Sequence, residues 1–162
     1  MKLSQIAWDD WQADDLATLV FIIHAGRILL IRKKRGLGAG KINGPGGKLD
    51  PGETPEACAI RECEEEIGVT PVDLEYCGEN LFQFTDGYGI HVHVYRAFEF
   101  LGEPHETDEA IPMWYALDAI PYDEMWADDE LWVPAVLSGQ TFVGRWIFDG
   151  DDYLEYELDI DH

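Results

Sequence analysis

Residues 47–69 read Gly47-Lys-Leu-Asp-Pro-Gly-Glu53-Thr54-Pro55-Glu-Ala57-Cys-Ala-Ile60-Arg61-Glu62-Cys63-Glu-Glu65-Glu66-Ile67-Gly68-Val69. Thr54 followed by Pro55 predicts a helix start, because threonine caps helix N-termini and proline fits the first turn. Gly68 predicts the helix end, because glycine tolerates the left-handed cap conformation. The buried stripe of this helix is expected from the apolar residues at helical spacing, which are Ala57, Ile60, Cys63 and Ile67.

Three glutamates share one arc of the same helix. At about 100° per residue, Glu62, Glu65 and Glu66 lie within an arc of roughly 100° that we place opposite the apolar stripe. Taken alone, they are also what a solvated helix face looks like, because like charges at this spacing cost a helix only about 0.2–0.5 kcal/mol per pair. The preceding Gly-rich loop, residues 36–47, changes that balance, because its backbone groups can approach a phosphate or a metal ion. Carboxylates beside such a loop favour a hard cation and hydrolysis of a phosphoanhydride.

The segment resembles the Nudix box, G-x5-E-x7-R-E-U-x-E-E-x-G-U, where U is aliphatic. Every fixed letter of that motif is present between Gly47 and Val69. The one departure is Cys63 at an aliphatic position, and a free cysteine packs as a small hydrophobic residue.

This resemblance implies an α/β/α sandwich around a mixed sheet and a set of roles. Mg²⁺, with Mn²⁺ as a substitute, would be held by Glu62, Glu65 and Glu66, by a backbone carbonyl near Gly46 and by Glu109. The resemblance also implies that Glu53 and Arg61 pair and orient the metal carboxylates. For the general base, Glu66 is the first choice and Glu109 the second, with His105 a weaker candidate. We expect activity that requires a divalent ion and rises toward alkaline pH.

Outside the box, residues 17–160 are similar to the MutT-type oxidised purine nucleoside triphosphatases, which sanitise the nucleotide pool. The similarity rests on three stretches, which are residues 33–48, 114–129 and 144–150. It implies hydrolysis of substrates such as 8-oxo-dGTP or 2-hydroxy-dATP to a monophosphate and pyrophosphate. It also implies a set of substrate contacts: Thr18, Lys33, Asn43, Pro45, Gly47, Lys48, Phe82, Trp126, Asp128 and Asp129.

Residue chemistry is compatible with a purine site. Asn43 offers a hydrogen-bond acceptor and two donors, and adjacent Asp128 and Asp129 can shift each other's pKa so that one stays protonated and adapts to more than one base. Trp126 would stack on the base and Phe82 would line the opposite wall. Asp128 could instead cap the next helix, and both aromatics could be plain core. Because the vertebrate members of that family carry aromatics at three positions where this chain does not, we expect a different pocket wall at Leu37, Ile42 and Pro45.

Composition limits the class of protein. The chain has 162 residues, with 11 Lys and Arg against 33 Asp and Glu, which gives a net charge of −22. Such acidity disfavours binding to nucleic acid polymers and to anionic membranes. Three cysteines without a CxxC motif, and an N-terminus without an apolar signal, suggest a cytoplasmic protein. We expect one domain over residues 1–162, with residues 1–15 as an N-terminal extension, and a monomer.

Periodicity and turn signals place the remaining elements of an α/β fold. Strands are expected at residues 17–24, 27–32, 72–85, 90–99, 113–117, 141–149 and 153–159. A turn is expected at Ala25-Gly26, and a second helix from Asp128 to Leu137, closed by Gly139.

Other functions on the same fold remain open. One is a Nudix pyrophosphatase for another substrate, such as ADP-ribose or a dinucleoside polyphosphate. A non-catalytic nucleotide-binding module is disfavoured because every box glutamate is present, and a diphosphate isomerase is disfavoured because no further catalytic side chains can be identified.

Overall fold

The computed structural model describes residues 1–161, and it contains two helices and two sheets within that range. The helices are α1 (Pro55–Ile67) and α2 (Asp129–Ser138), with a short 3-10 turn at Leu3–Gln5 and another at Tyr122–Glu124. The strands are β1 (Asp15–His24), β2 (Arg27–Lys33), β3 (Ile42–Asn43), β4 (Gly46–Lys48), β5 (Thr70–Val72), β6 (Glu75–Phe84), β7 (Gly89–Ala97), β8 (Glu99–Leu101), β9 (Ala110–Ala116), β10 (Thr141–Asp149) and β11 (Asp152–Asp161).

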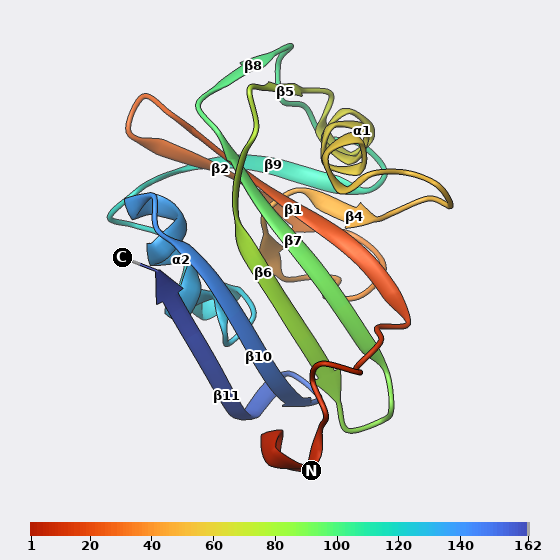
Figure 1. The fold of residues 1–162 in the computed structure, drawn as a ribbon. Helices are drawn as coiled ribbons and strands as arrows, with labels where there is room; N and C mark the ends of the chain where they lie inside the picture. Colours follow the sequence, from red (N-terminus) through yellow and green to blue (C-terminus); the bar gives the residue numbers. More distant parts are fainter. Residues whose placement is uncertain (162) are drawn as a thin grey trace.

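The large sheet is mixed, and its strand order is β11-β10-β6-β7-β1-β2-β3. The parallel pairs are β1 with β7 and β6 with β10, whereas β4 joins β1 and β9 joins β2 in antiparallel fashion. A separate two-stranded sheet consists of β5 and β8 and lies beyond one end of the long strands (Figure 1). The expected mixed α/β class is therefore confirmed.

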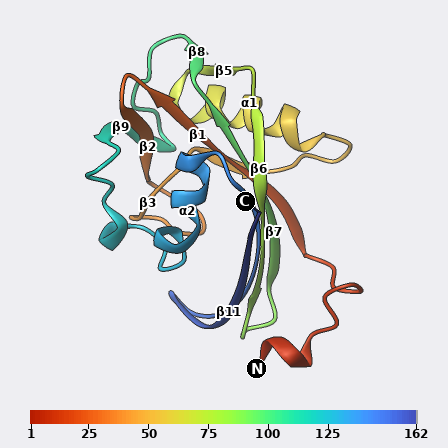
Figure 2. The same ribbon diagram turned by 60° about the vertical axis from the view of Figure 1, so that its left-hand side comes forward.

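The two helices cover opposite faces of the large sheet. Successive side chains of a strand point to opposite faces; in β1, Phe21 packs in the cluster that contains α2, and Val20 packs in the cluster under α1. Figure 1 shows α1 near β1 and β4, and α2 beside β10, and Figure 2 shows the two helices on different sides of β1. This arrangement is the expected α/β/α sandwich.

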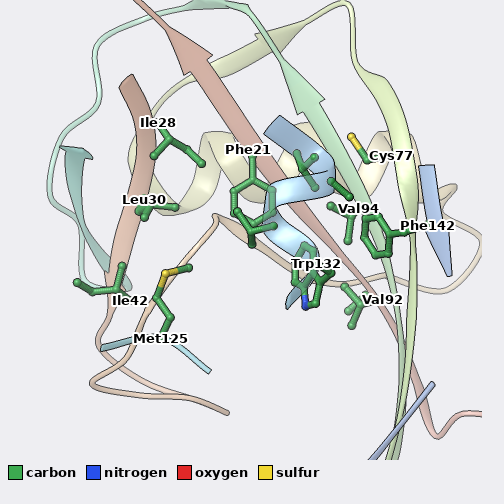
Figure 3. Close-up of a cluster of buried hydrophobic side chains, with 14 of the residues drawn as sticks. Phe21, Ile28, Leu30, Ile42, Cys77, Val92, Val94, Met125, Trp132 and Phe142 are labelled. Carbon is green, nitrogen blue, oxygen red and sulfur yellow. The ribbon is translucent and has the colours of Figure 1, made fainter. Parts of the chain in front are cut away.

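The α2 side of the core is built from aromatic side chains. Trp132 of α2 stacks on Phe142 of β10 with ring centroids 5.3 Å apart and meets Phe21 edge-on at 5.8 Å. Figure 3 shows Phe21 and Trp132 among the buried side chains of this cluster, with Ile42 and Met125 to one side. Ile42 is completely buried here, so it does not form the pocket wall that the sequence suggested.

Helix α1 begins and ends as expected but buries a different face. Thr54 Oγ1 accepts a hydrogen bond from the N–H of Ala57, and Gly68 takes the left-handed conformation at φ 76°. Ala57, however, is exposed, and Ile60 is only partly buried. The side chains that α1 does bury are Cys58, Ala59, Cys63, Glu66 and Ile67. Glu66 is thus on the buried face and not opposite it, which corrects the expected arc.

The Gly-rich loop contains two short strands that the sequence did not predict. Its second half forms the short strands β3 and β4, which pair with β2 and β1. The turn expected at Ala25-Gly26 is present, and both residues have positive φ, at 53° and 74°. Among residues 1–161, no helix combines the length and apolarity needed to cross a membrane. The three cysteines are free and buried.

Candidate active site

Two glycines allow the loop to pass between β1 and α1. Gly46 pairs with Leu19 of β1, and a Cβ built on Gly46 would lie 1.9 Å from the carbonyl oxygen of Thr18. A Cβ on Gly47 would lie 2.4 Å from Cδ of Glu62 on α1. Neither contact is possible for real atoms, so a larger residue at position 46 would push the loop off β1, and one at position 47 would displace the Glu62 carboxylate. These glycines therefore bring the loop backbone against the box carboxylates.

Arg61 links the carboxylates at the base of this loop. Its guanidinium makes a bidentate pair with Glu53, at 2.7 and 2.8 Å, which holds the pKa of Glu53 low, at about 2. Its Nη1 also donates to Glu62 Oε1 at 2.9 Å and to Glu65 Oε2 at 3.0 Å. The Glu53–Arg61 pair is thus present, and through Arg61 it fixes the positions of Glu62 and Glu65.

Glu66 is the most enclosed of the box carboxylates, with 3% of its surface exposed. Burial raises its pKa to about 8, although the N–H of Gly46 donates to its Oε1 at 2.8 Å and partly offsets that rise. Burial also raises the pKa of Glu62. The positive charge of Lys33, which lines the same cavity, opposes the rise in the pKa of Glu66. A cation at this point would favour the charged forms of both glutamates.

A single cavity of about 500 Å³ joins these carboxylates to the expected base site. At one end, which we call the carboxylate end, lie Glu62, Glu65, Glu66 and Glu109. The remaining predicted residues that line the cavity are Thr18, Lys33, Asn43, Gly46, Gly47, Lys48, Phe82, Trp126, Asp128 and Asp129. Glu53 and Arg61 lie behind the glutamates and do not line it. Fourteen residues from distant parts of the chain therefore meet as expected.

Pro45 and His105 do not take part in the cavity. Pro45 is buried, and its carbonyl accepts a hydrogen bond from the N–H of Val20 at 2.8 Å, so its role is to attach the loop to β1. His105 is exposed and packs on Gly68 at the end of α1. Leu37 does line the cavity, with 46% of its surface exposed. Of the three positions expected to alter the pocket wall, Leu37 alone reaches it.

Glu109 reaches the cavity from the segment before β9. Arg35 Nη2 lies 3.1 Å from Glu109 Oε1, and the carbonyl of Glu109 accepts from the N–H of Lys34. Thr107 attaches the same segment to α1 by donating to the carbonyl of Glu66 at 2.6 Å. Arg35 was not among the predicted contacts, although its place in a cluster of basic residues was a usable signal.

The far end of the cavity, where the purine base is expected and which we call the base end, holds two buried aspartates. Asp128 and Asp129 are 2% and 3% exposed. Asp128 occupies the N-cap position of α2 but caps nothing with its side chain; its Oδ2 accepts from Trp132 Nε1 at 2.6 Å. Oδ2 of Asp129 is buried and has no hydrogen-bond partner. Burial raises the pKa of Asp128 to about 6, and burial together with the Asp128 charge raises the pKa of Asp129 well above its ordinary value.

Aromatic rings enclose this end. Trp126 is partly buried, meets Phe84 and Phe148 edge-on at 6.4 and 5.8 Å, and has Lys41 Nζ 5.1 Å from its ring centroid. Phe82 stacks on Trp146 at 6.2 Å. Both predicted rings are therefore partly core and partly cavity wall. Three further cavity residues were not predicted, namely Phe84, Phe148 and Trp132, because apolar residues of the cavity wall look like core residues in the sequence.

Neighbouring residues position the polar cavity side chains near the Gly-rich loop. The Thr18 hydroxyl is 1% exposed and lies 3.4 Å from Cys58 Sγ. Lys48 Nζ lies 3.2 Å from Asp15, and Asn43 Oδ1 accepts from the N–H of Gly44 at 2.9 Å. The oxygen of Asn43 thus orients the loop at the cavity edge.

The residues at the carboxylate end fit a hard divalent cation. Four glutamates line the same end of the cavity, and burial disfavours the charge of two of them. Oxygen donors of this kind are the ligands that Mg²⁺ and Mn²⁺ prefer.

Comparisons with known proteins identify the family of this chain. The NUDIX domain family matches residues 14–136. The chain is 47% identical to an oxidized purine nucleoside triphosphate hydrolase of Danio rerio, over 89% of this chain and 94% of that protein. It is 41% identical to the Mus musculus protein of the same name, over 88% and 93%. A MutT protein structure from Bacillus halodurans superposes with a TM-score of 0.81 at 26% identity, covering 90% of this chain and 97% of that one.

The chain therefore belongs to the Nudix family, and it is a Nudix hydrolase. Enzymes of this family generally use divalent metal ions and act on small nucleotide substrates.

Proposed function

We propose that this chain hydrolyses oxidised purine nucleoside triphosphates, such as 8-oxo-dGTP or 2-hydroxy-dATP, to the nucleoside monophosphate and pyrophosphate. The observation that carries the proposal is the single cavity, which has glutamates at one end and the buried Asp128–Asp129 pair at the other. Relatives named for this activity share 47% and 41% identity over nearly the whole chain. The physiological role is removal of damaged nucleotides from the pool.

The base end recognises the modified purine. A buried carboxyl oxygen without a partner costs about 1–3 kcal/mol, and a ligand that supplies the missing hydrogen bond recovers that cost. Asp129 Oδ2 is such an atom. The raised pKa values of Asp128 and Asp129 favour a proton held within the pair, and a pair that holds one proton can both donate and accept. Asn43 adds further polar contacts, and Trp126 and Phe82 supply the stacking surfaces.

The carboxylate end holds the triphosphate and its cation. Glu62, Glu65, Glu66, Glu109 and the carbonyl of Gly46 would bind Mg²⁺, for which Mn²⁺ can substitute. When bound, the ion neutralises the polyphosphate and lowers the pKa of the attacking water. Thr18, Lys33, Gly47 and Lys48 contact the nucleotide, and the charge of Lys33 also acts on Glu66.

Proton transfer falls to a glutamate at the same end. Glu66 accepts the proton of the water that attacks the β-phosphorus, with Glu109 as the second candidate. Glu66 must be deprotonated for this step, so the rate rises toward alkaline pH until that carboxylate, whose pKa burial raises and a bound cation lowers, is fully charged. The enzyme acts as a monomer in the cytoplasm.

The test follows the oxygen atom and the products. In ¹⁸O-labelled water with Mg²⁺, 8-oxo-dGTP should give unlabelled monophosphate and labelled pyrophosphate, and excess chelator should stop the reaction. Release of inorganic phosphate and a nucleoside diphosphate, or full activity in the chelator, would refute the proposal.

A further inference from the structure

A second cluster of metal-ligating side chains lies on the opposite face of the large sheet from the cavity. Glu79 of β6 pairs directly with His93 of β7, and His91 precedes His93 by two residues, so all three share one face. The intervening residues Ile90 and Val92 point to the other face and line the cavity. The cluster is therefore separate from the hydrolase site.

The three side chains converge on a common point. Glu79 Oε2 lies 3.6 Å from His91 Nε2 and 3.9 Å from His93 Nδ1, and the two imidazole centroids are 4.5 Å apart. In the described part of the chain, this is the one group of three or more His, Cys, Asp or Glu residues whose ligand atoms all lie within 4.8 Å of one another.

One ligand atom of the cluster lacks a hydrogen-bond partner, and the cluster can be reached from solvent. His91 Nε2 is buried and has no hydrogen-bond partner, a state that buried polar atoms rarely occupy. A ring nitrogen without a hydrogen-bond partner can bind a metal ion, because metal ligation uses the neutral imidazole. The side chains of Glu79, His91 and His93 are 30%, 24% and 20% exposed, which gives an ion access from solvent.

We propose that Glu79, His91 and His93 bind one divalent transition-metal ion of the zinc class. Two imidazoles and a carboxylate suit Zn²⁺ and its neighbours in the first transition row better than they suit Mg²⁺. A tetrahedral ion with bonds of about 2.0–2.1 Å places its ligand atoms about 3.3 Å apart. The observed separations of 3.6 and 3.9 Å approach that value, so small side-chain rotations complete the site.

Neighbouring side chains support the same site. The Tyr76 hydroxyl lies 3.0 Å from Glu79 Oε2 and 3.2 Å from His93 Nδ1. An ion on that nitrogen displaces the hydroxyl from His93, while the bond to Glu79 remains and orients the carboxylate. Trp11, whose Nε1 donates to Gln83 at 2.8 Å, has its ring centroid 6.5 Å from that of His91. Bound metal thus lies beside the segment that precedes β1 and ties β6 to β7.

The test is a calorimetric titration with Zn²⁺ in saturating Mg²⁺, which keeps the box glutamates occupied. The wild-type chain should bind one equivalent of Zn²⁺, and His91→Asn and Glu79→Gln should each weaken that binding at least tenfold. His24→Asn is the matched control, because His24 is exposed at the far end of β1 and lies outside the cluster. Its affinity should equal that of the wild type.

Histidine side-chain NMR of the unaltered protein provides a readout that no folding defect can confuse. One equivalent of Zn²⁺ should shift the ring signals of His91 and His93 and leave those of His24 and His105 in place. Equal Zn²⁺ binding in all the variants, no binding beyond the Mg²⁺ sites, or unshifted His91 and His93 signals would each overturn the proposal.

Discussion

The two ends of the nucleotide cavity both bury carboxyl groups, but they compensate them differently. At the carboxylate end, Arg61 donates to Glu62 and Glu65, and the N–H of Gly46 donates to Glu66. At the base end, Asp128 has one donor, Trp132, and Oδ2 of Asp129 has none. The first end is therefore arranged for charge and a cation, whereas the second is arranged for a proton and a hydrogen-bonding ligand.

This contrast predicts that chemistry and selectivity can be damaged separately. Changes at the carboxylate end should slow every substrate alike, because all of them share the triphosphate. Changes at the base end should alter which substrate is preferred and leave the phosphate chemistry in place.

The largest expected effect comes from Glu66→Gln. The change keeps the shape of the side chain but removes a ligand or base, so kcat should fall by about 10²- to 10⁴-fold for every substrate. Steady-state kinetics with Mg²⁺ measures this. Glu64→Gln, on the exposed face of the same helix, is the matched control and should retain nearly full activity. A Glu66→Gln enzyme as fast as the wild type would remove Glu66 from the mechanism.

A smaller and selective effect is expected at Asp129. Asp129→Leu removes the polar group, so kcat/KM for oxidised purines should fall by about 10- to 200-fold. Asp129→Asn gives the side chain a fixed acceptor oxygen and a fixed donor nitrogen, so it can no longer gain or lose a proton to suit the base. The ratio of kcat/KM values for 8-oxo-dGTP and 2-hydroxy-dATP should therefore change by about tenfold. An unchanged ratio would show that the pair does not adapt its proton to the base.

The smallest effect concerns stability. The pKa of Asp128 is raised to about 6 and that of Asp129 is raised well above its ordinary value, so the folded chain holds protons that the unfolded chain has released. This contribution is complete below the ordinary aspartate pKa of about 4 and is lost as pH rises through the folded values. Thermal melting should show a Tm that declines from pH 5 to pH 8, and Asp129→Asn should reduce that decline. Parallel curves for the two proteins would contradict the assignment.

The carboxylate end was predictable because one local segment encodes most of it. Thr54, Pro55 and Gly68 bound the helix, and the box spacing gives Glu62, Glu65, Glu66 and the Glu53–Arg61 pair. The helix face was harder to predict. Ala57 is small enough to be exposed at little cost, and a buried Glu66 contradicts the usual exposure of glutamate.

The base end depended on the resemblance, because distant segments build it. Parallel pairing of β6 with β10 brings Phe148 beside Phe84 and Phe82, and local patterns do not specify such a pairing. The resemblance implied that Pro45 contacts the substrate. Pro45 is instead buried, and its carbonyl accepts a hydrogen bond from the N–H of Val20. The long strands were predicted well, since β-branched runs between turn residues are a local signal, whereas the short strands β3, β4, β5 and β8 were not predicted as separate elements.

The central claim is that this cavity selects oxidised purines for pyrophosphohydrolysis. The most direct test compares kcat/KM for pyrophosphate release from 8-oxo-dGTP, 2-hydroxy-dATP, dGTP and dATP, with ADP-ribose turnover measured beside them, all in Mg²⁺. The account predicts at least about a tenfold preference for an oxidised purine over its unmodified counterpart, which corresponds to about 1.4 kcal/mol. Equal values across the panel, or ADP-ribose as the best substrate, would contradict it.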